Sequence, residues 1–376
     1  MLRLLFALLL TTGLSASALG LGDKPMTTKY HAYFGGYTGG KAGGKGIMVA
    51  DFDTATGKLS DPTLAAEVGS PSFLALHPNG KTLYAVGEGG GKDGGPVYAF
   101  AVESDGKLTK KNDLLSGGSG PCHVSIDAAG KFATVANYGG GSTAIFSLND
   151  DGSLKARTAF VQHVGSSANK SRQSGPHGHC SFFDETGTFV LTADLGLDKV
   201  LVFKLNRDDG SIALIASIDL PPGSGPRHFH LAPGNKTAFI CGELDSTVHV
   251  ASLDFAAKSF KIVQTLSTLP EPTPGNSTAE CRIHPNGKFV YVSNRGHNSI
   301  AAFRLEDGKL TAIGHAKGEF KIPRNFNLDP SGKWMLVAGQ ENSVVEVFAV
   351  GADGLPKATG TVVSTPSPVC IRFLAK

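Results

Sequence analysis

The feature that most constrains this chain is a repeat with a period near fifty residues. Six segments combine an apolar run, a turn, and a β-branched or aromatic run that ends in a polar residue: "ALHPNGKTLYAVGE", "SIDAAGKFATVAN", "FFDETGTFVLTAD", "HLAPGNKTAFICGE", "RIHPNGKFVYVSN" and "NLDPSGKWMLVAGQ". The steps between their turns are 50, 57, 48, 52 and 45 residues, and the turn residues are Gly80, Gly130, Gly187, Asn235, Gly287 and Gly332. Such a period is typical of a modular array in which each unit buries its apolar faces against its neighbours.

Each repeat predicts four antiparallel strands. A third run, such as "STAIFSL" or "KVLVFKL", follows the first two, and a D-G turn at Asp105, Asp151, Asp209 or Asp307 leads into a fourth, less apolar run. No segment longer than a few residues has helical periodicity, so the predicted fold class is all-β. Four-stranded units of this size, arranged radially, are the blades of a β-propeller.

The two ends of the chain predict a seventh blade. The N-terminal runs "AYFGGYT", "GIMVADFD" and "TGKLS" have the character of strands two and three and the turn into strand four, whereas the C-terminal "SPVCIRFL" has the character of a first strand alone. Pairing the N-terminal strands with the C-terminal strand would close the ring and leave no exposed sheet edge. We therefore expect one seven-bladed β-propeller over residues 19–376.

The first residues have the pattern of a secretory signal peptide over residues 1–18. Arg3 precedes an apolar run from Leu4 to Leu10, and a small-residue A-x-A site ends at Ala18. An uncleaved membrane anchor is the alternative, but the apolar run is shorter than the roughly 20 residues that a spanning helix needs. The expected location is periplasmic or secreted.

Three N-x-S/T sequons, at Asn169, Asn235 and Asn276, would matter only in a host that glycosylates exported chains.

Charge and cysteine content limit the classes of ligand. The 35 basic and 32 acidic residues are spread along the chain without a basic stripe, so we expect no nucleic-acid partner and, once the signal is cleaved, no membrane partner. The number of cysteines, five, is odd, and there is no C-x-x-C pattern; each lies in an apolar run: Cys122, Cys180, Cys241, Cys281 and Cys370. We interpret them as small buried apolar residues, although Cys180 beside His179 has an alternative as a nucleophile.

Polar side chains gather where the first strand of each blade begins and the second ends, which in a propeller is one mouth of the central channel. The residues at strand-one starts are Ser72, Phe73, Cys122, His123, His177, His179, Arg227, His228, Ala279, Glu280, Arg324 and Asn325. Those at strand-two ends are Glu88, Asn137, Asp194, Glu243, Asn294, Arg295 and Gln340. This concentration of imidazole, guanidinium and carboxylate groups predicts a site for a small anionic or polar molecule.

Several roles are open to these residues. His177 and His179, two apart on a strand, would share a face and could contact a substrate, bind backbone, or hold a metal together with His123, His228 or His230. No metal is expected, because no Cys or carboxylate stands at a tight companion spacing. Arg227 and Arg295 would either form salt bridges at the rim or recognise a carboxylate. Glu243 would either pair with Arg227 or serve as a base.

The segments "GPCHVSID", "VANYGGGS", "SGPHGHCSFFD", "SGPRHFHLAP", "GELDSTVHV", "AECRIHPNGKFVYVSNRGHNSIAAF" and "PRNFNLDPSGKWMLVAGQ" resemble the seven-bladed propeller lactonase family. That family includes 6-phosphogluconolactonases and is similar to carboxymuconate lactonising enzymes. The resemblance covers nearly everything after the signal peptide. It implies hydrolysis of a sugar-acid lactone without a cofactor, with a small-molecule lactone as partner.

The resemblance also implies site residues. By motif context the catalytic groups would be His179, Arg227, Glu243 and Arg295. From their positions at the channel mouth, and not from the resemblance, the substrate-contacting groups would be His123, Asn137, His177, His228, Glu280, Arg324 and Gln340. An export signal does not suit a cytosolic phosphorylated substrate, so an unphosphorylated aldonolactone or another extracellular sugar-acid lactone is expected. The alternatives are a secreted, non-enzymatic propeller that binds a ligand or protein, and an isomerase or lyase acting on lactones.

Overall fold

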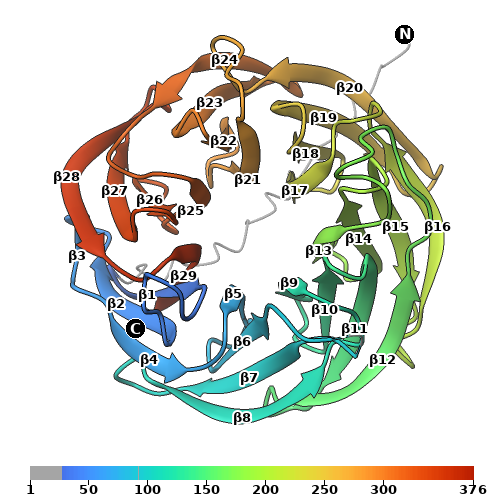
Figure 1. The fold of residues 1–376 in the computed structure, drawn as a ribbon, viewed down its shortest axis with the longest axis horizontal. Coiled ribbons are helices and arrows are strands. Elements are labelled where there is room, and N and C mark those ends of the chain that lie inside the picture. The colour runs from blue at the N-terminus through green and yellow to red at the C-terminus, as the bar shows by residue number, and fades with distance from the viewer. Residues whose placement is uncertain (1–27, 92) are drawn as a thin grey trace, which may run out of the picture.

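The computed structural model describes residues 28–91 and 93–376, and the predicted signal peptide lies outside them. Seven antiparallel sheets are arranged as a ring (Figure 1), which confirms the predicted seven-bladed β-propeller. The described residues contain no helix, and so none that could cross a membrane.

Six blades consist of four consecutive strands each, with the first strand innermost. The first three of these are β5 (Pro71–Leu76), β6 (Thr82–Gly87), β7 (Pro96–Val102) and β8 (Leu108–Leu115); β9 (Pro121–Ile126), β10 (Phe132–Asn137), β11 (Ser142–Leu148) and β12 (Leu154–Gln162); and β13 (Gly178–Phe183), β14 (Phe189–Asp194), β15 (Lys199–Leu205) and β16 (Ile212–Asp219).

The next three are β17 (Pro226–Leu231), β18 (Thr237–Gly242), β19 (Thr247–Asp254) and β20 (Ser259–Ser267); β21 (Ser277–Ile283), β22 (Phe289–Arg295), β23 (Ser299–Glu306) and β24 (Lys309–Ala316); and β25 (Pro323–Leu328), β26 (Trp334–Gly339), β27 (Val344–Val350) and β28 (Pro356–Ser364). In each of these blades the turn between the first two strands contains the predicted repeat residue.

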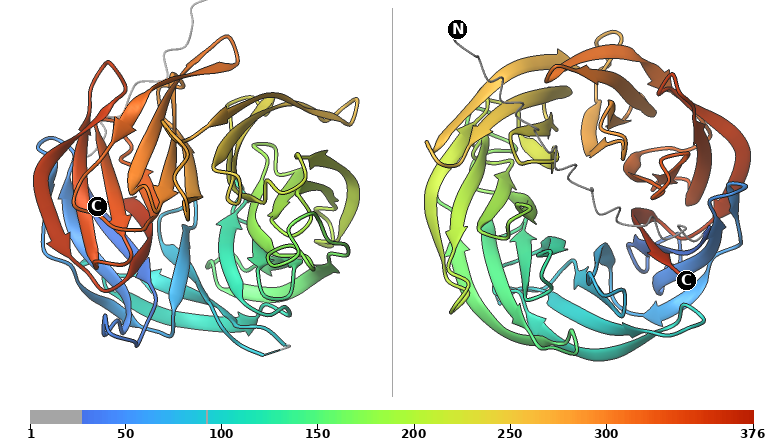
Figure 2. Two further views of the ribbon diagram at one scale, coloured as in Figure 1. Left: turned by 45° about the horizontal axis from the view of Figure 1, so that its top comes forward. Right: turned by 180° about the vertical axis from the view of Figure 1, so that it is seen from behind.

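The seventh blade joins the two ends of the chain, as predicted. β29 (Pro368–Ala375) is its inner strand and pairs antiparallel with β1 (Lys29–Gly36), which pairs with β2 (Gly46–Asp53). Its outer strand is divided into β3 (Lys58–Leu59) and β4 (Thr63–Glu67), both of which pair with β2. Figure 2 shows β29 beside the N-terminal strands in both views.

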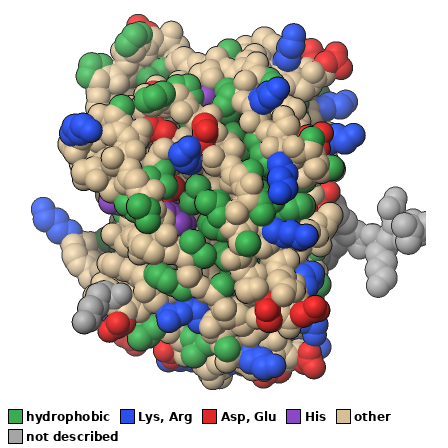
Figure 3. Space-filling model, turned by 90° about the vertical axis from the view of Figure 1, so that its right-hand side faces the viewer, with side chains coloured by type: hydrophobic (Ala, Val, Ile, Leu, Met, Phe, Trp, Pro, Cys, Tyr) green, Lys and Arg blue, Asp and Glu red, His purple; other side chains and the backbone are tan. Residues whose placement is uncertain are grey.

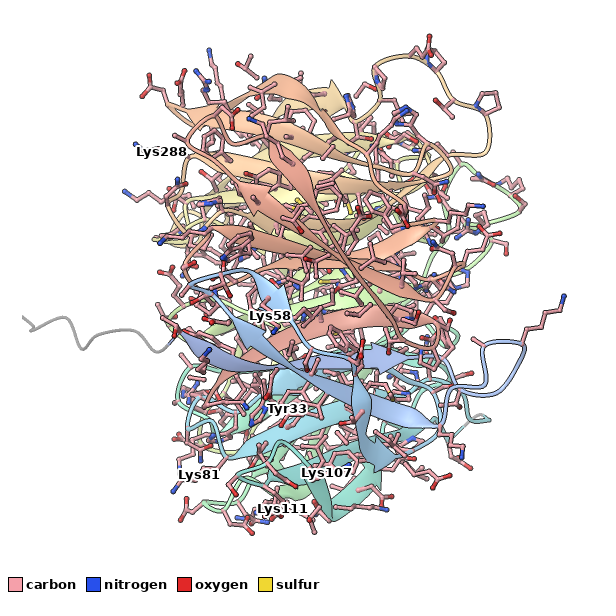
Figure 4. All side chains as sticks on the ribbon, turned by 90° about the vertical axis from the view of Figure 1, so that its left-hand side faces the viewer. Tyr33, Lys58, Lys81, Lys107, Lys111 and Lys288 are labelled. Atoms are coloured by element: carbon pink, nitrogen blue, oxygen red, sulfur yellow. The ribbon has the colours of Figure 1, made fainter. Side chains whose placement is uncertain are left out.

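The core lies between blades rather than at one centre. The inner three strands are buried along almost their whole length, so that each sheet buries both faces against its neighbours, whereas the outer strands are largely exposed. Tyr33 of β1, in Figure 4, donates from its hydroxyl to the carbonyl oxygen of Gly106 in the D-G turn of the next blade, at 3.0 Å. Tyr84 and Tyr291 make the same contact with Gly152 and Gly354, at 2.5 and 2.8 Å.

The outer surface has no charge segregation on the side where β12 and β16 face outward. Lys, Arg, Asp and Glu side chains are interspersed there among apolar ones (Figure 3). The five cysteines are free and buried, as predicted.

Candidate functional site

The polar residues meet at the end of the ring axis where the inner strands begin, which we call the entry end. In all six consecutive blades the pairing of the first two strands shifts register at this end, as between Pro71 and Phe73 or between Gly178 and Cys180. A bulge releases one residue from the ladder and re-aims its side chain. The residues released in this way include His179, Arg227 and Arg324.

Glu243 lies at the centre of a cluster of three arginines. Its Oε2 lies 2.9 Å from Nε of Arg227 and 3.0 Å from Nη2 of Arg295, and its Oε1 accepts a hydrogen bond from Nη2 of Arg172 at 2.7 Å. Arg227 also donates to the carbonyl oxygen of Ala279 at 2.6 Å. Since Glu243 and Arg227 are both almost completely buried, the carboxylate of Glu243 holds the guanidinium group of Arg227 in a fixed position.

The cluster determines the charge states of its members. Burial alone would raise the pKa of Glu243, but Arg295, Arg227 and Arg172 outweigh it and lower that pKa to about 2. Burial, reinforced by Arg227, lowers the pKa of Arg295 to about 10. At neutral pH the group therefore carries three positive charges and one negative charge.

A fourth guanidinium lies at the same end. Arg324, at the start of β25, has no hydrogen bond or ion pair with any described residue; its guanidinium carbon lies 5.6 Å from the ring centroid of Tyr37. The hydroxyl of Tyr37 donates to Oε2 of Glu88 at 3.0 Å. The donors of Arg324 are thus available for a ligand, and the net charge of this end favours an anionic or electron-rich one.

His179 is the neutral group beside these charges. Burial, then Arg227 and His228, hold its pKa well below the usual range for histidine. Nδ1 of its ring lies 3.9 Å from Sγ of Cys122, and Nε2 has no hydrogen-bond partner among the described residues. The ring lies edge-on to Tyr138, with centroids 5.3 Å apart. A neutral imidazole with a free nitrogen can accept a proton.

His177 lies outside β13 and the bulge falls at His179, so the two do not follow simple strand alternation. They nevertheless meet on Tyr138. His177 stacks on that ring with centroids 4.7 Å apart, and its Nδ1 donates to the carbonyl oxygen of Tyr138 at 2.9 Å.

Three predicted substrate contacts lie deeper along the axis. Nδ1 of His228 donates to Oε2 of Glu280 at 3.1 Å, and Glu280 also accepts from the amide of Asn325. Burial lowers the pKa of His228 to about 4, an effect that Glu280 opposes. His123 is fully buried and lies against Phe73, with centroids 4.1 Å apart. These side chains form a layer beneath the entry end.

At the ends of the second strands, two of the predicted residues lie one position before the place where they were expected. Glu88, Glu243 and Gln340 directly follow their strands, and equivalent backbone bonds show that Tyr138 and Leu195 do so too. Arg295 is the last residue of β22, where it pairs with Ser277. Asn137 and Asp194 stand one position earlier. The amide of Asn137 donates to Oγ of Ser142 at 3.0 Å, and Asp194 accepts from the backbone of His177 at 2.8 Å. Both therefore fix local turns.

Two site residues were missed by sequence reasoning. Tyr138 was missed because Asn137, one residue earlier, was expected at the end of its strand. Arg172 comes from the loop 163–177 between β12 and β13, which is tied down by the hydrogen bond from the Gln173 amide to the carbonyl oxygen of Leu195 at 2.8 Å. The sequence did indicate a long loop here, because the longest step between repeat turns, 57 residues, falls between Gly130 and Gly187.

Among residues 28–91 and 93–376, no three His, Cys, Asp or Glu side chains are grouped so that they could hold a metal ion. Cys180 does not have the environment of a nucleophile, because burial raises the pKa of its thiol well above the usual range.

The fold and the site together define a seven-bladed propeller with an arginine-rich entry end. The family model "Lactonase, 7-bladed beta-propeller" matches residues 31–373, and the chain belongs to that family. A 6-phosphogluconolactonase of Bacillus subtilis is 34% identical over 92% of this chain and 99% of the relative, and one of Formosa agariphila is 35% identical over 84% and 91%. Among solved structures, the periplasmic gluconolactonase PpgL of Pseudomonas aeruginosa aligns with a TM-score of 0.86 and 28% identity, covering 92% of this chain and 99% of that chain.

Proposed function

We propose that this protein hydrolyses a sugar-acid lactone of the aldonolactone type at the entry end. The observation that carries the proposal is the neutral imidazole of His179, whose Nε2 has no hydrogen-bond partner among the described residues, beside the arginine cluster on Glu243, in a chain that belongs to the lactonase family. Lactone opening needs a nucleophilic water, a stabiliser for the carbonyl oxygen and a proton for the leaving alkoxide.

His179 supplies the proton transfers in this mechanism. Its free nitrogen takes a proton from water as the oxygen attacks the lactone carbonyl carbon. When the bond between that carbon and the ring oxygen breaks, the imidazolium returns the proton to the departing alkoxide. The balance is one lactone and one water in, one hydroxy acid out, with no covalent intermediate and no cofactor.

The arginines stabilise the negative charge that develops on the carbonyl oxygen. Arg324 has free donors, and Arg295 and Arg227 keep nitrogens that Glu243 does not contact. Glu243 itself suits a positioning role better than a base, because both of its oxygens are engaged by arginines, whereas Nε2 of His179 has no hydrogen-bond partner among the described residues. This favours His179 over Glu243 for the base.

Two considerations support an unphosphorylated substrate. The N-terminal pattern predicts export, and the solved Pseudomonas aeruginosa relative is described as a periplasmic gluconolactonase. The curated relatives described as 6-phosphogluconolactonases make the phosphorylated lactone the necessary comparison.

The test is proton release from glucono-δ-lactone and from its 6-phosphate, each corrected for spontaneous hydrolysis and measured with and without chelator. We expect acceleration of the unphosphorylated lactone that persists in chelator and falls at least about a hundredfold in His179→Ala, the usual contribution of a positioned base. Because burial keeps His179 neutral, the rate should not decline between pH 7 and pH 6. A full rate in His179→Ala would exclude the mechanism, and preference for the phosphate ester would correct the substrate.

A further inference from the structure

The inner strands end in a second group of polar side chains, at the opposite end of the ring axis, which we call the exit end. Its members stand two residues after the deeper layer on four neighbouring inner strands: His230 on β17, Arg282 on β21, Asn327 on β25 and Arg372 on β29. None of them belongs to the site proposed above.

An aromatic layer separates this group from the entry end. The ring of Phe73 lies 4.1 Å from that of His123 and 5.6 Å from that of His228, centroid to centroid. The guanidinium of Arg372 lies 4.6 Å from the same Phe73 ring. A ligand at the exit end would therefore be separated from His179 by packed side chains.

Arg282 is incompletely paired. Its Nε lies 3.4 Å from Oε1 of Glu280, but Nε and Nη2 are both buried without a hydrogen-bond partner, and no other described residue accepts from the guanidinium. Glu280 is already engaged by His228 and Asn325. Buried guanidinium donors without acceptors are costly, so this arrangement calls for an external acceptor.

His230 presents a second donor at the same place. Burial, reinforced by Arg282, lowers its pKa to about 4, so the ring is neutral at pH 7. Its Nδ1 accepts a hydrogen bond from the backbone N–H of Ile283 at 3.2 Å. In a neutral imidazole the other nitrogen must then carry the proton, so Nε2 is a donor without an acceptor among the described residues.

Two cavities, of about 340 and 360 Å³, open on these donors, and His230, Leu231, Arg282 and Glu185 line both. Apolar side chains, including Phe182 in one and Leu328 in the other, complete the walls. Glu185 is exposed at the rim, where its Oε2 accepts the backbone N–H of Gly234 at 3.0 Å. Such a volume, with a few convergent donors, suits a small molecule.

We propose that the exit end binds a small oxyanion, a carboxylate or a phosphate group, through Arg282 and Nε2–H of His230. The guanidinium fork matches either group, and the imidazole supplies a second direction of hydrogen bonding. This site is independent of the proposed lactone hydrolysis.

The test is isothermal titration calorimetry of the whole protein with inorganic phosphate and, separately, gluconate. Arg324→Gln is the background, because it weakens anion binding at the entry end. His230→Phe, which keeps the ring and removes the donor, and Arg282→Gln should each weaken the remaining affinity at least about tenfold. Arg282→Gln deprives Glu280 of its nearest cation and can fail to fold, so His230→Phe is the decisive variant.

The controls separate this proposal from the proposed function. His230→Phe should keep the lactone hydrolysis rate of the unaltered chain, and His179→Ala should keep the exit-end affinity. The stronger of the two probes identifies phosphate or carboxylate as the group recognised. Affinity that is lost entirely in Arg324→Gln, or unchanged in His230→Phe, would overturn the proposal, as would a crystal soaked with the stronger probe that shows only water at Arg282.

Discussion

At the scale of the residue, the entry end depends on one carboxylate that serves three cations. Arg227 and Glu243 are 2% and 6% exposed at their side chains, so neither can be hydrated if its partner is removed. Arg172 is 41% exposed and can exchange Glu243 for water. Loss of the ion pair with Glu243 should therefore destabilise the protein more through Arg227 than through Arg172.

We expect Glu243→Gln to cost about 3 kcal/mol of the free energy of unfolding at pH 7, because it leaves buried guanidinium groups without their anion. The pH dependence follows from a folded pKa of about 2 against an ordinary value of 4.5. The stabilisation is complete above pH 4.5 and is lost as the pH falls towards 2, so the difference in melting temperature between the two proteins should shrink below pH 4.5.

Glu67→Gln is the matched control, since Glu67 is exposed on β4 and its substitution should stay within about 0.5 kcal/mol. Arg172→Ala should lower the melting temperature less than Glu243→Gln. Equal stability of Glu243→Gln and the unaltered protein at pH 7 would show that the arginines do not need this carboxylate.

At the scale of the element, the blades are joined by side chains that cross from one sheet to a turn of the next. The hydroxyls of Tyr33, Tyr84 and Tyr291 donate to glycine carbonyls of adjacent D-G turns. Burial raises the pKa of each, so each hydroxyl keeps its proton. The D-G turn therefore also provides an acceptor for the neighbouring blade.

Tyr291→Phe should cost about 1 kcal/mol, because the packing of the ring is kept while the carbonyl of Gly354 loses its donor. Thermal unfolding measures the cost, and amide hydrogen exchange should show faster exchange in the D-G turn around Gly354. Tyr98→Phe is the control, since the Tyr98 hydroxyl has no hydrogen bond with a described residue. The idea fails if both variants behave alike.

The elements also show what the sequence could and could not predict. Turn spacing and strand character sufficed for seven blades, for closure through β29 and for the entry end around Glu243. Bulges were not predictable, because they depend on the pairing of two strands, and so Asn137 was expected where Tyr138 lies. Arg172 was missed because loop sequence does not reveal which strand end a loop covers. Arg282 was not singled out from the sequence, and His230 was considered only as a possible metal ligand.

At the scale of the whole molecule, stability depends on closing the ring between segments that are far apart in the chain. Ile371 on β29 is fully buried, in a cluster that includes Phe34 and Phe52 of the N-terminal strands and Leu336 of the preceding blade. This blade alone has its inner strand supplied from the other end of the chain. Loss of packing here exposes the edge of β1, which pairs with β29, and also takes a packing neighbour from β25 of the preceding blade.

Ile371→Ala should therefore cost about 3 kcal/mol, the usual cost of such a cavity, and should speed amide hydrogen exchange in β1 and β29 together. Ile240→Ala removes the same atoms from a fully buried site in a sequence-continuous blade, so it should lower the melting temperature comparably while exchange in β1 stays slow. Leu214→Ala, 58% exposed on β16, should change neither. Faster exchange confined to β29 in Ile371→Ala would mean that β1 holds its place without the C-terminal strand, and that the closing pair does not act as one unit.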